Sequence, residues 1–165
     1  MPLALALDAG TTSIKALLFD ASGALVASHA QEYTLLKPGV DLVELNPETY
    51  WQAAAKAIRA VLAASKANPK DVAAAGVTSQ GETLIVLDRE GRLLRPAIVW
   101  LDNRSRAEAA ALSRAFSPEE VYRRTGQQEM VPTWTATRIA WLRDHEPDTF
   151  RRAHKFLLVE DYLIH

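Results

Sequence analysis

The feature that most constrains the fold is a short polar loop that joins two apolar runs at the start of the chain. Residues 3–7 and 14–19 are mostly apolar, which predicts two buried strands. The loop between them, Asp8 to Ser13, holds a carboxylate, a glycine and three hydroxyl side chains. Strands joined by so short a segment must be antiparallel neighbours. Such a loop is either an ordinary hairpin turn or a cradle for phosphate oxygens, in which Asp8 holds the Mg²⁺ that accompanies a nucleotide.

A third strand is expected over residues 24–33, after a turn at Asp20–Gly23, so the chain opens with an antiparallel meander. Lys37–Gly39 is expected to break this strand pattern. A helix should then run to residue 67, with Asn46 as its N-cap and Pro47 at its first position.

The rest of the chain mixes strand and helix patterns, which indicates an α/β domain with a mixed sheet opened by antiparallel hairpins. Trp51 and Trp141 lie at helical spacing with other apolar residues, so both are expected to pack in the core. Strands are expected at residues 72–78, 84–87, 97–100 and 155–159, the first of them buried. Helices are expected at residues 102–116 and 135–145. Three more helices are expected to begin at Ser117-Pro118, at Pro147 and at Glu160.

Composition narrows the function classes. The 165 residues suffice for one domain, and 19 basic against 20 acidic residues give no argument for a nucleic-acid or anionic-membrane partner. The absence of cysteine excludes disulfides, thiolate catalysis and cysteine-ligated metals, and the histidines lack metal-ligand spacing. No apolar run is long enough to span a membrane and no signal peptide precedes residue 3, so a cytoplasmic protein is expected.

Two further groups of residues are candidates for chemistry. A polar segment, residues 78–83, follows a predicted strand, where α/β sheets bind ligands. Its Gln80 and Glu82 suit several hydroxyls at once, as in a polyol, although a hydrated loop is an equal alternative. Lys15, one residue into the second strand, either neutralises phosphate charge or is an ordinary exposed lysine.

Trp100 to Arg104 form the last candidate group. The tryptophan offers a face for the carbon side of a sugar. Asp102 and Arg104 either pair with each other or reach the pocket, and the alternative for Asp102 is the N-cap of the next helix.

Residues 8–15 resemble the first phosphate loop of the FGGY carbohydrate kinases, the sugar kinases related to glycerol kinase and xylulokinase. Further segments match that family in the same order along nearly the whole chain, and the ordered set is far more specific than any one of them. These segments are 43–47 with Trp51, 77–82, 95–104, 125–126, Pro132, 136–142 and 161–164.

The resemblance implies two ribonuclease H-like lobes of the actin/hexokinase/Hsp70 superfamily and transfer of the γ-phosphoryl group of ATP to a sugar or polyol hydroxyl. It also implies Mg²⁺ at Asp8, through water, and is compatible with a homodimer. The residues implied to bind ATP are Asp8, Gly10, Thr11, Thr12, Ser13 and Lys15, and those implied to bind the substrate are Gln80, Gly81, Glu82, Trp100, Asp102, Arg104 and Thr133.

Three positions depart from the family pattern. Glycerol kinases carry arginine where this chain has Gly81 and tyrosine where it has Thr133, while xylulokinases carry histidine where it has Glu82. These departures argue against both glycerol and xylulose, and Gly81 leaves room for a substrate bulkier than glycerol.

Family members are much longer, so residues 1–165 are expected to be the N-terminal part of the first lobe, incomplete and inactive alone. No catalytic residue is expected within them, because the resemblance places the general-base aspartate beyond His165. Two alternatives stay open: a non-catalytic domain that binds a sugar or a partner, and another ATPase of the superfamily. The segments around Gln80 and Trp100 argue against the second, since actin-like and chaperone lineages lack them.

Overall fold

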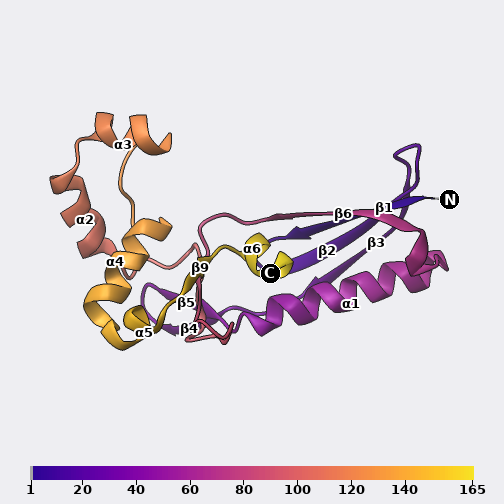
Figure 1. Ribbon diagram of the computed structural model, residues 1–165, viewed down its shortest axis with the longest axis horizontal. Coiled ribbons are helices and arrows are strands. Elements are labelled where there is room, and N and C mark those ends of the chain that lie inside the picture. Colours follow the sequence, from indigo (N-terminus) through magenta and orange to yellow (C-terminus); the bar gives the residue numbers. More distant parts are fainter. Residues whose placement is uncertain (1) are drawn as a thin grey trace. The chain divides into compact units, whose positions relative to one another are not determined.

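The computed structural model describes residues 2–165, which divide into two compact units (Figure 1). Unit 1 contains the residues up to Leu35, then Asn46–Gly81 and Val159–His165. Unit 2 contains Leu36–Leu45 and Glu82–Leu158. Among residues 2–165, no helix has the length and apolar character that a membrane span requires.

Unit 1 is built on a mixed four-stranded sheet with the order β3-β2-β1-β6. β1 (Leu3–Ala9), β2 (Ser13–Phe19) and β3 (Leu25–Glu32) form the predicted antiparallel meander, and β6 (Val72–Ser79) pairs in parallel with β1. The meander follows from the short turns, since neither turn is long enough for a crossover.

Helix α1 (Glu48–Ser65) runs along this sheet and contacts β2 and β3 (Figure 1). Strand alternation decides which side chains it covers: Ile14 is fully buried while Lys15 is exposed, as the period of two predicts. Asn46 Oδ1 accepts the N–H of Glu48 at 3.1 Å, as a capping side chain does, but the regular helix begins at Glu48 and its N-cap is Pro47, one residue later than predicted. The helix ends at Lys66, whose φ of 56° is left-handed.

Two predictions for unit 1 were wrong. Trp51 is 52% exposed. The buried face of α1 runs through Tyr50, Ala54 and Val61, and Trp51, which follows Tyr50, points away from that face. β6 is mostly exposed rather than buried, because it lies at the far edge of the sheet from β2 and β3, the strands that α1 mainly contacts.

Unit 2 holds two small sheets. β4 (Leu36–Gly39), β5 (Leu42–Leu45) and β8 (Ala97–Ile98) form one, and β7 (Ile85–Leu87) pairs with β9 (Lys155–Leu157) in the other. The expected break at residues 37–39 was therefore wrong. Pro38 is tolerated because β4 is an edge strand, and Asp41 turns the chain with a φ of 63°.

The helices of unit 2 are α2 (Arg106–Ala115), α3 (Pro118–Thr125), α4 (Thr135–His145) and α5 (Pro147–Arg152), and the last helix, α6 (Val159–Ile164), belongs to unit 1. The limits of α4 and the Ser117 cap of α3 match the predictions. α2 starts later than expected, since residues 102–105 are irregular. The core consists of Leu84, Val86, Ile98 and Leu142, with Ile139, Trp141, Phe150 and Phe156 packed against it.

Candidate functional site

The polar loop from Asp8 to Ser13, called the hydroxyl-rich loop below, is a tight turn between β1 and β2. The N–H of Gly10 donates to the carbonyl of Ser13 at 2.9 Å, and a Cβ on Gly10 would lie 3.3 Å from that oxygen, which favours glycine there. Asp8 and Lys15 are cross-strand partners, so their side chains lie on the same face of the sheet. Because the Gly10 amide is used within the turn, it is not available to a ligand, and the donors that the loop could offer to a phosphate are its hydroxyls and its other amides.

Tyr33, just after β3, contacts this loop at two points. Its N–H donates to the carbonyl of Thr12 at 2.9 Å, and its hydroxyl donates to the carbonyl of Gly10 at 2.5 Å. Its ring meets that of Tyr50 edge-on, with centroids 5.4 Å apart. Burial first, and then Tyr50 and the charge of Asp8, raise the pKa of Tyr33 well above its usual range. The sequence interpretation missed this contact, although the pairing of Ser13 with Glu32 brings the end of β3 to the loop.

Gln80 lies at the same end of the sheet. Its N–H donates to the carbonyl of Ala9 at 2.9 Å, which extends the β1–β6 pairing to the start of the loop. Its side-chain Nε2 donates to the hydroxyl of Tyr50 at 3.0 Å. Its Oε1 is buried without a hydrogen-bond partner among the described residues. Unit 1 therefore brings Gln80 to the carboxyl ends of β1 and β6, where α/β sheets bind ligands.

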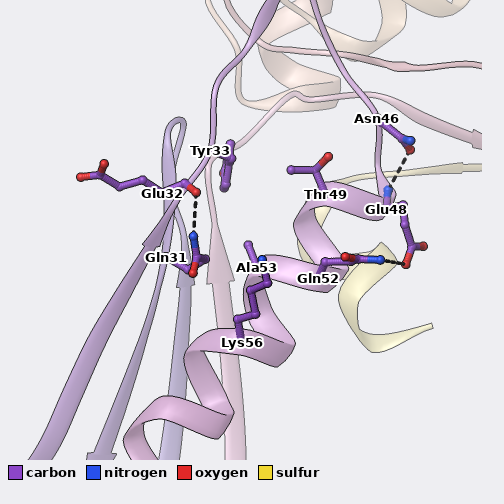
Figure 2. A pocket seen from close by; sticks show the side chains of 9 residues that line it. All are labelled: Gln31, Glu32, Tyr33, Asn46, Glu48, Thr49, Gln52, Ala53 and Lys56. Atoms are coloured by element: carbon purple, nitrogen blue, oxygen red, sulfur yellow. Dashed lines mark hydrogen bonds between the residues drawn. The ribbon is translucent and has the colours of Figure 1, made fainter.

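A polar hollow of about 300 Å³ lies between the end of β3 and the first turns of α1 (Figure 2). None of the residues predicted to bind ATP or the substrate lines this hollow. Tyr33 lines it and also hydrogen-bonds the hydroxyl-rich loop. The side chains around it are Gln31, Glu32, Tyr33, Asn46, Glu48, Thr49, Gln52, Ala53 and Lys56.

In unit 2, residues of α4 bind Glu82 through both its side chain and its backbone carbonyl. Its Oε2 accepts the N–H of Thr135 at 2.9 Å and the hydroxyl of Thr135 at 2.8 Å, so one carboxylate oxygen caps the helix. Its carbonyl oxygen accepts a hydrogen bond from Arg138. Its φ of 64° is left-handed, which costs a non-glycine residue about 1 kcal/mol or more. The neighbouring Gly81 is exposed, and no atom lies within 4 Å of a Cβ placed there.

Arg138 is the largest fully buried side chain of the described residues, and the sequence interpretation did not single it out. Besides the carbonyl of Glu82, its guanidinium donates to the carbonyls of Trp100 at 2.8 Å and Asp102 at 3.1 Å. Burial lowers its pKa to about 10. Arg138 thus ties residue 82 to residues 100–102. Its position four residues before the buried Leu142 was the available signal.

Trp100 lies at the surface with 37% exposure, and its N–H donates to the hydroxyl of Thr83 at 3.1 Å. Thr133, also in unit 2, is partly exposed. Both side chains are therefore accessible from solvent, as a contact with a substrate requires.

Asp102 is fully buried and both its carboxylate oxygens are engaged. Oδ2 accepts the N–H of Val43 at 2.6 Å and Nη2 of Arg104 at 2.8 Å, and Oδ1 accepts the N–H and Nε of Arg104, both at 2.9 Å. Of the two alternatives for Asp102 and Arg104, the structure shows the pairing with each other. The alternative of an N-cap was wrong, since α2 begins at Arg106 after Ser105.

The Asp102–Arg104 pair belongs to a larger charge network. Glu44 Oε1 accepts from Arg104 at 2.8 Å and from Arg95 at 2.5 Å, and Arg95 also binds Glu146 at 2.6 Å. The guanidinium of Arg104 lies 4.9 Å from the centre of the Trp141 ring. This network leaves the Arg104 side chain only 5% exposed, so it supports the residues around it rather than offering a free cation.

The titration of Asp102 makes the stability of the folded protein depend on pH. Burial favours its neutral form, but hydrogen bonds from Arg104 and Val43 outweigh it, so the pKa of Asp102 lies below the ordinary 3.8. A depressed folded-state pKa contributes stability above the unfolded-state pKa that is lost as the pH falls. We expect the urea concentration at the midpoint of unfolding to decrease as the pH is lowered from about 5 to about 3. This decrease should be smaller in the Asp102→Asn variant. The same fall in both proteins would contradict the assignment.

The candidate residues thus fall into two sets. Unit 1 brings Gln80 close to the loop residues, and Gly81 ends that unit. Unit 2 links Glu82 and Trp100 to the Asp102–Arg104 pair through Arg138. The set in unit 1 is Asp8, Gly10, Thr11, Thr12, Ser13, Lys15, Gln80 and Gly81, and the set in unit 2 is Glu82, Trp100, Asp102, Arg104 and Thr133.

Within residues 2–165, no three His, Cys, Asp or Glu side chains come together as a metal cage. Asp8 is partly exposed beside the loop and fits a different arrangement. Mg²⁺ is commonly held by one or two carboxylates together with waters and substrate phosphates. The residues present therefore fit Mg²⁺ that arrives with a nucleotide.

The mixed sheet opened by antiparallel hairpins, with its polar loop after β1, is that of an α/β protein of the actin/hexokinase-like class. Residues 3–165 match the model of the N-terminal domain of the FGGY family of carbohydrate kinases. The chain belongs to this family, as its resemblance predicted.

Individual relatives agree with this assignment. The chain is 35% identical to xylulose kinase of Escherichia coli (strain K12), over 95% of this chain and 31% of that protein. It is 37% identical to glycerol kinase of Rhodospirillum centenum, over 99% of this chain and 34% of that protein. It superposes on the crystal structure of gluconate kinase from Lactobacillus acidophilus with a TM-score of 0.90 at 28% identity, covering 99% of this chain and 32% of that one. The chain thus spans about a third of the length of the relatives it matches.

Proposed function

We propose that the protein containing this chain transfers the γ-phosphoryl group of ATP to a hydroxyl of a sugar or polyol. The observation that carries the proposal is the hydroxyl-rich loop with Asp8 and Gln80 at one end of the unit 1 sheet, in a chain of this family. The hydroxyl oxygen forms a bond to the γ-phosphorus while the bond from that phosphorus to the β–γ bridging oxygen breaks. ADP leaves with the electron pair, and the hydroxyl proton passes to a general base outside these residues, which the family resemblance identifies as an aspartate.

In this proposal the loop binds the phosphates of ATP. The hydroxyls of Thr11, Thr12 and Ser13 and the loop amides donate hydrogen bonds, Gly10 lets the chain turn tightly, and Lys15 adds positive charge on the face that it shares with Asp8. Asp8 holds Mg²⁺ directly or through water. When bound, the metal offsets negative charge on the transferring phosphoryl group.

We assign substrate contacts to two separate groups of residues, Gln80 and Gly81 in unit 1, and Glu82, Trp100 and Thr133 in unit 2. Gln80 and the second carboxylate oxygen of Glu82 hydrogen-bond hydroxyls, and Trp100 offers its exposed face to a sugar ring. Because Asp102 and Arg104 are buried, we propose that they support Glu82 and Trp100 in unit 2 instead of touching the substrate. This revises the role that the family resemblance implied for both residues.

The full-length protein tests the proposal in a coupled assay that follows ADP release with a panel of polyols, ketoses and sugar acids. We expect ATP- and Mg²⁺-dependent turnover of at least one of them. Failure to phosphorylate any of them, with the protein folded and Mg²⁺ present, would overturn the proposal in favour of a non-catalytic domain that binds a sugar or a partner.

The open space at Gly81 predicts the size of the substrate. The full-length protein should turn over a five- or six-carbon substrate better than glycerol, because among residues 2–165 no side chain fills the space at residue 81. Gly81→Arg, which restores the residue of glycerol kinases, should shift the kcat/KM ratio toward glycerol by about tenfold. Glycerol as the best substrate of the unsubstituted protein would contradict this prediction.

Three further expectations complete the proposal and stay predictions. The protein is cytoplasmic, it has no nucleic-acid partner, and it forms a homodimer. Light scattering on the purified full-length protein would measure its oligomeric state directly.

A further inference from the structure

Tyr33 holds the candidate phosphate loop by two separate hydrogen bonds, one from its backbone and one from its side chain. The bond from its hydroxyl to the Gly10 carbonyl is short, at 2.5 Å, and the bond from its N–H to the Thr12 carbonyl is 2.9 Å. Tyr50 supports the ring edge-on, and Figure 2 shows Tyr33 among the side chains around the hollow between β3 and α1. The two hydrogen bonds from Tyr33 thus hold the carbonyls of Gly10 and Thr12 in place.

The hydroxyl bond determines how one peptide of the loop is turned. In a trans peptide the carbonyl oxygen and the following N–H point in opposite directions. Holding the Gly10 oxygen against Tyr33 therefore directs the N–H of Thr11 away from the tyrosine. Glycine has a freer backbone than other residues, so without that bond the peptide can rotate and present its oxygen on the opposite side. A carbonyl oxygen that faces a phosphate repels it, whereas an N–H attracts it.

We propose that Tyr33 is a positioning residue for the nucleotide phosphates: its hydroxyl fixes the Gly10–Thr11 peptide so that an N–H, and not a carbonyl, faces the bound phosphate group. The inference rests on the proposed function, since it assumes that the loop binds ATP. The raised pKa of Tyr33 keeps its hydroxyl protonated, so it stays a donor throughout the pH range of an assay.

Tyr33→Phe tests the proposal, because it removes one oxygen and keeps the ring against Tyr50. In the full-length protein we expect the Kd for ATP and for ADP, measured by titration calorimetry with Mg²⁺, to rise about tenfold. The KM for ATP should rise in parallel and the KM for the sugar should not change. The unfolding midpoint, measured alongside, should stay close to that of the unsubstituted protein.

Two matched hydroxyl deletions serve as controls. Tyr50→Phe removes the partner of Gln80, so it should raise the KM for the sugar and leave nucleotide affinity unchanged. Tyr122→Phe, on the exposed surface of α3, should change neither. Equal nucleotide affinity in Tyr33→Phe and the unsubstituted protein overturns the role of Tyr33. Absence of nucleotide binding by the unsubstituted protein overturns the proposed function itself.

Discussion

Replacing Asp8 with asparagine in the full-length protein is expected to lower kcat for sugar phosphorylation by about 100- to 1,000-fold, with the fold preserved. The amide keeps the size of the side chain but removes the negative charge that holds Mg²⁺ beside the phosphates. A metal contributes several kcal/mol to stabilising a phosphoryl-transfer transition state, and each 1.4 kcal/mol or so is a factor of about ten in rate. A coupled assay over a range of Mg²⁺ concentrations measures the loss, which excess Mg²⁺ should relieve only in part.

Asp20→Asn is the matched control, because Asp20 is also a turn carboxylate of the same sheet. It accepts the N–H of Ser22 at 2.8 Å and the N–H of Ala24 at 3.0 Å in the β2–β3 turn, and no proposed role in catalysis involves it. We expect Asp20→Asn to keep nearly full activity. An Asp8→Asn protein with activity within about threefold of the control would contradict a metal role for Asp8.

Replacing Arg138 with methionine is expected to destabilise the full-length protein by about 3 kcal/mol, the largest effect on stability that the structure predicts. Three carbonyl oxygens each lose a hydrogen bond from the guanidinium, and losing a buried hydrogen-bond partner costs about 1–3 kcal/mol. Removing a desolvated charge offsets part of this cost. Thermal unfolding measures the change, and Arg138→Lys should recover part of the loss because a lysine can still donate to some of these carbonyls.

Arg143→Met is the control on the same helix. Arg143 is exposed and pairs with its neighbour Asp144, at 2.6 Å, and such surface pairs contribute about 0–1 kcal/mol. A similar loss of stability in the two methionine variants would show that the carbonyl contacts of Arg138 do not stabilise the fold.

Local signals explain why the fold was largely predictable. The meander of β1, β2 and β3 follows from period-two alternation and short turns, and the limits of α4 were predicted without error. Exposure was harder to predict. Trp51 is a large apolar residue near the buried face of α1, yet Tyr50, Val61 and the alanines between them fill that face. The apolar composition of β6 cannot say whether another element covers the strand.

The candidate site was predictable only in part. The loop from Asp8 to Ser13 is continuous in sequence, so its composition alone identified it. Tyr33 and Arg138 act through contacts between distant segments, with backbone carbonyls as their partners. Carbonyl partners leave no trace in the side-chain sequence, and these two residues were missed for that reason. Asp102 was noticed, but its burial depends on Val43, which lies 59 residues earlier.

The way in which the two units share the chain determines when each can form during synthesis. Among the described residues, unit 1 takes its last piece from Val159–His165, where Glu160 binds Ser79 of β6, so the pieces of its sheet and helices are not all available until this segment has been translated. The whole of unit 2 is translated before that point. No single cut can separate the two, and neither can be expressed as one uninterrupted segment. Within the described residues, all the segments of unit 2 are therefore available before the last segment of unit 1, although the chain begins with the sheet of unit 1.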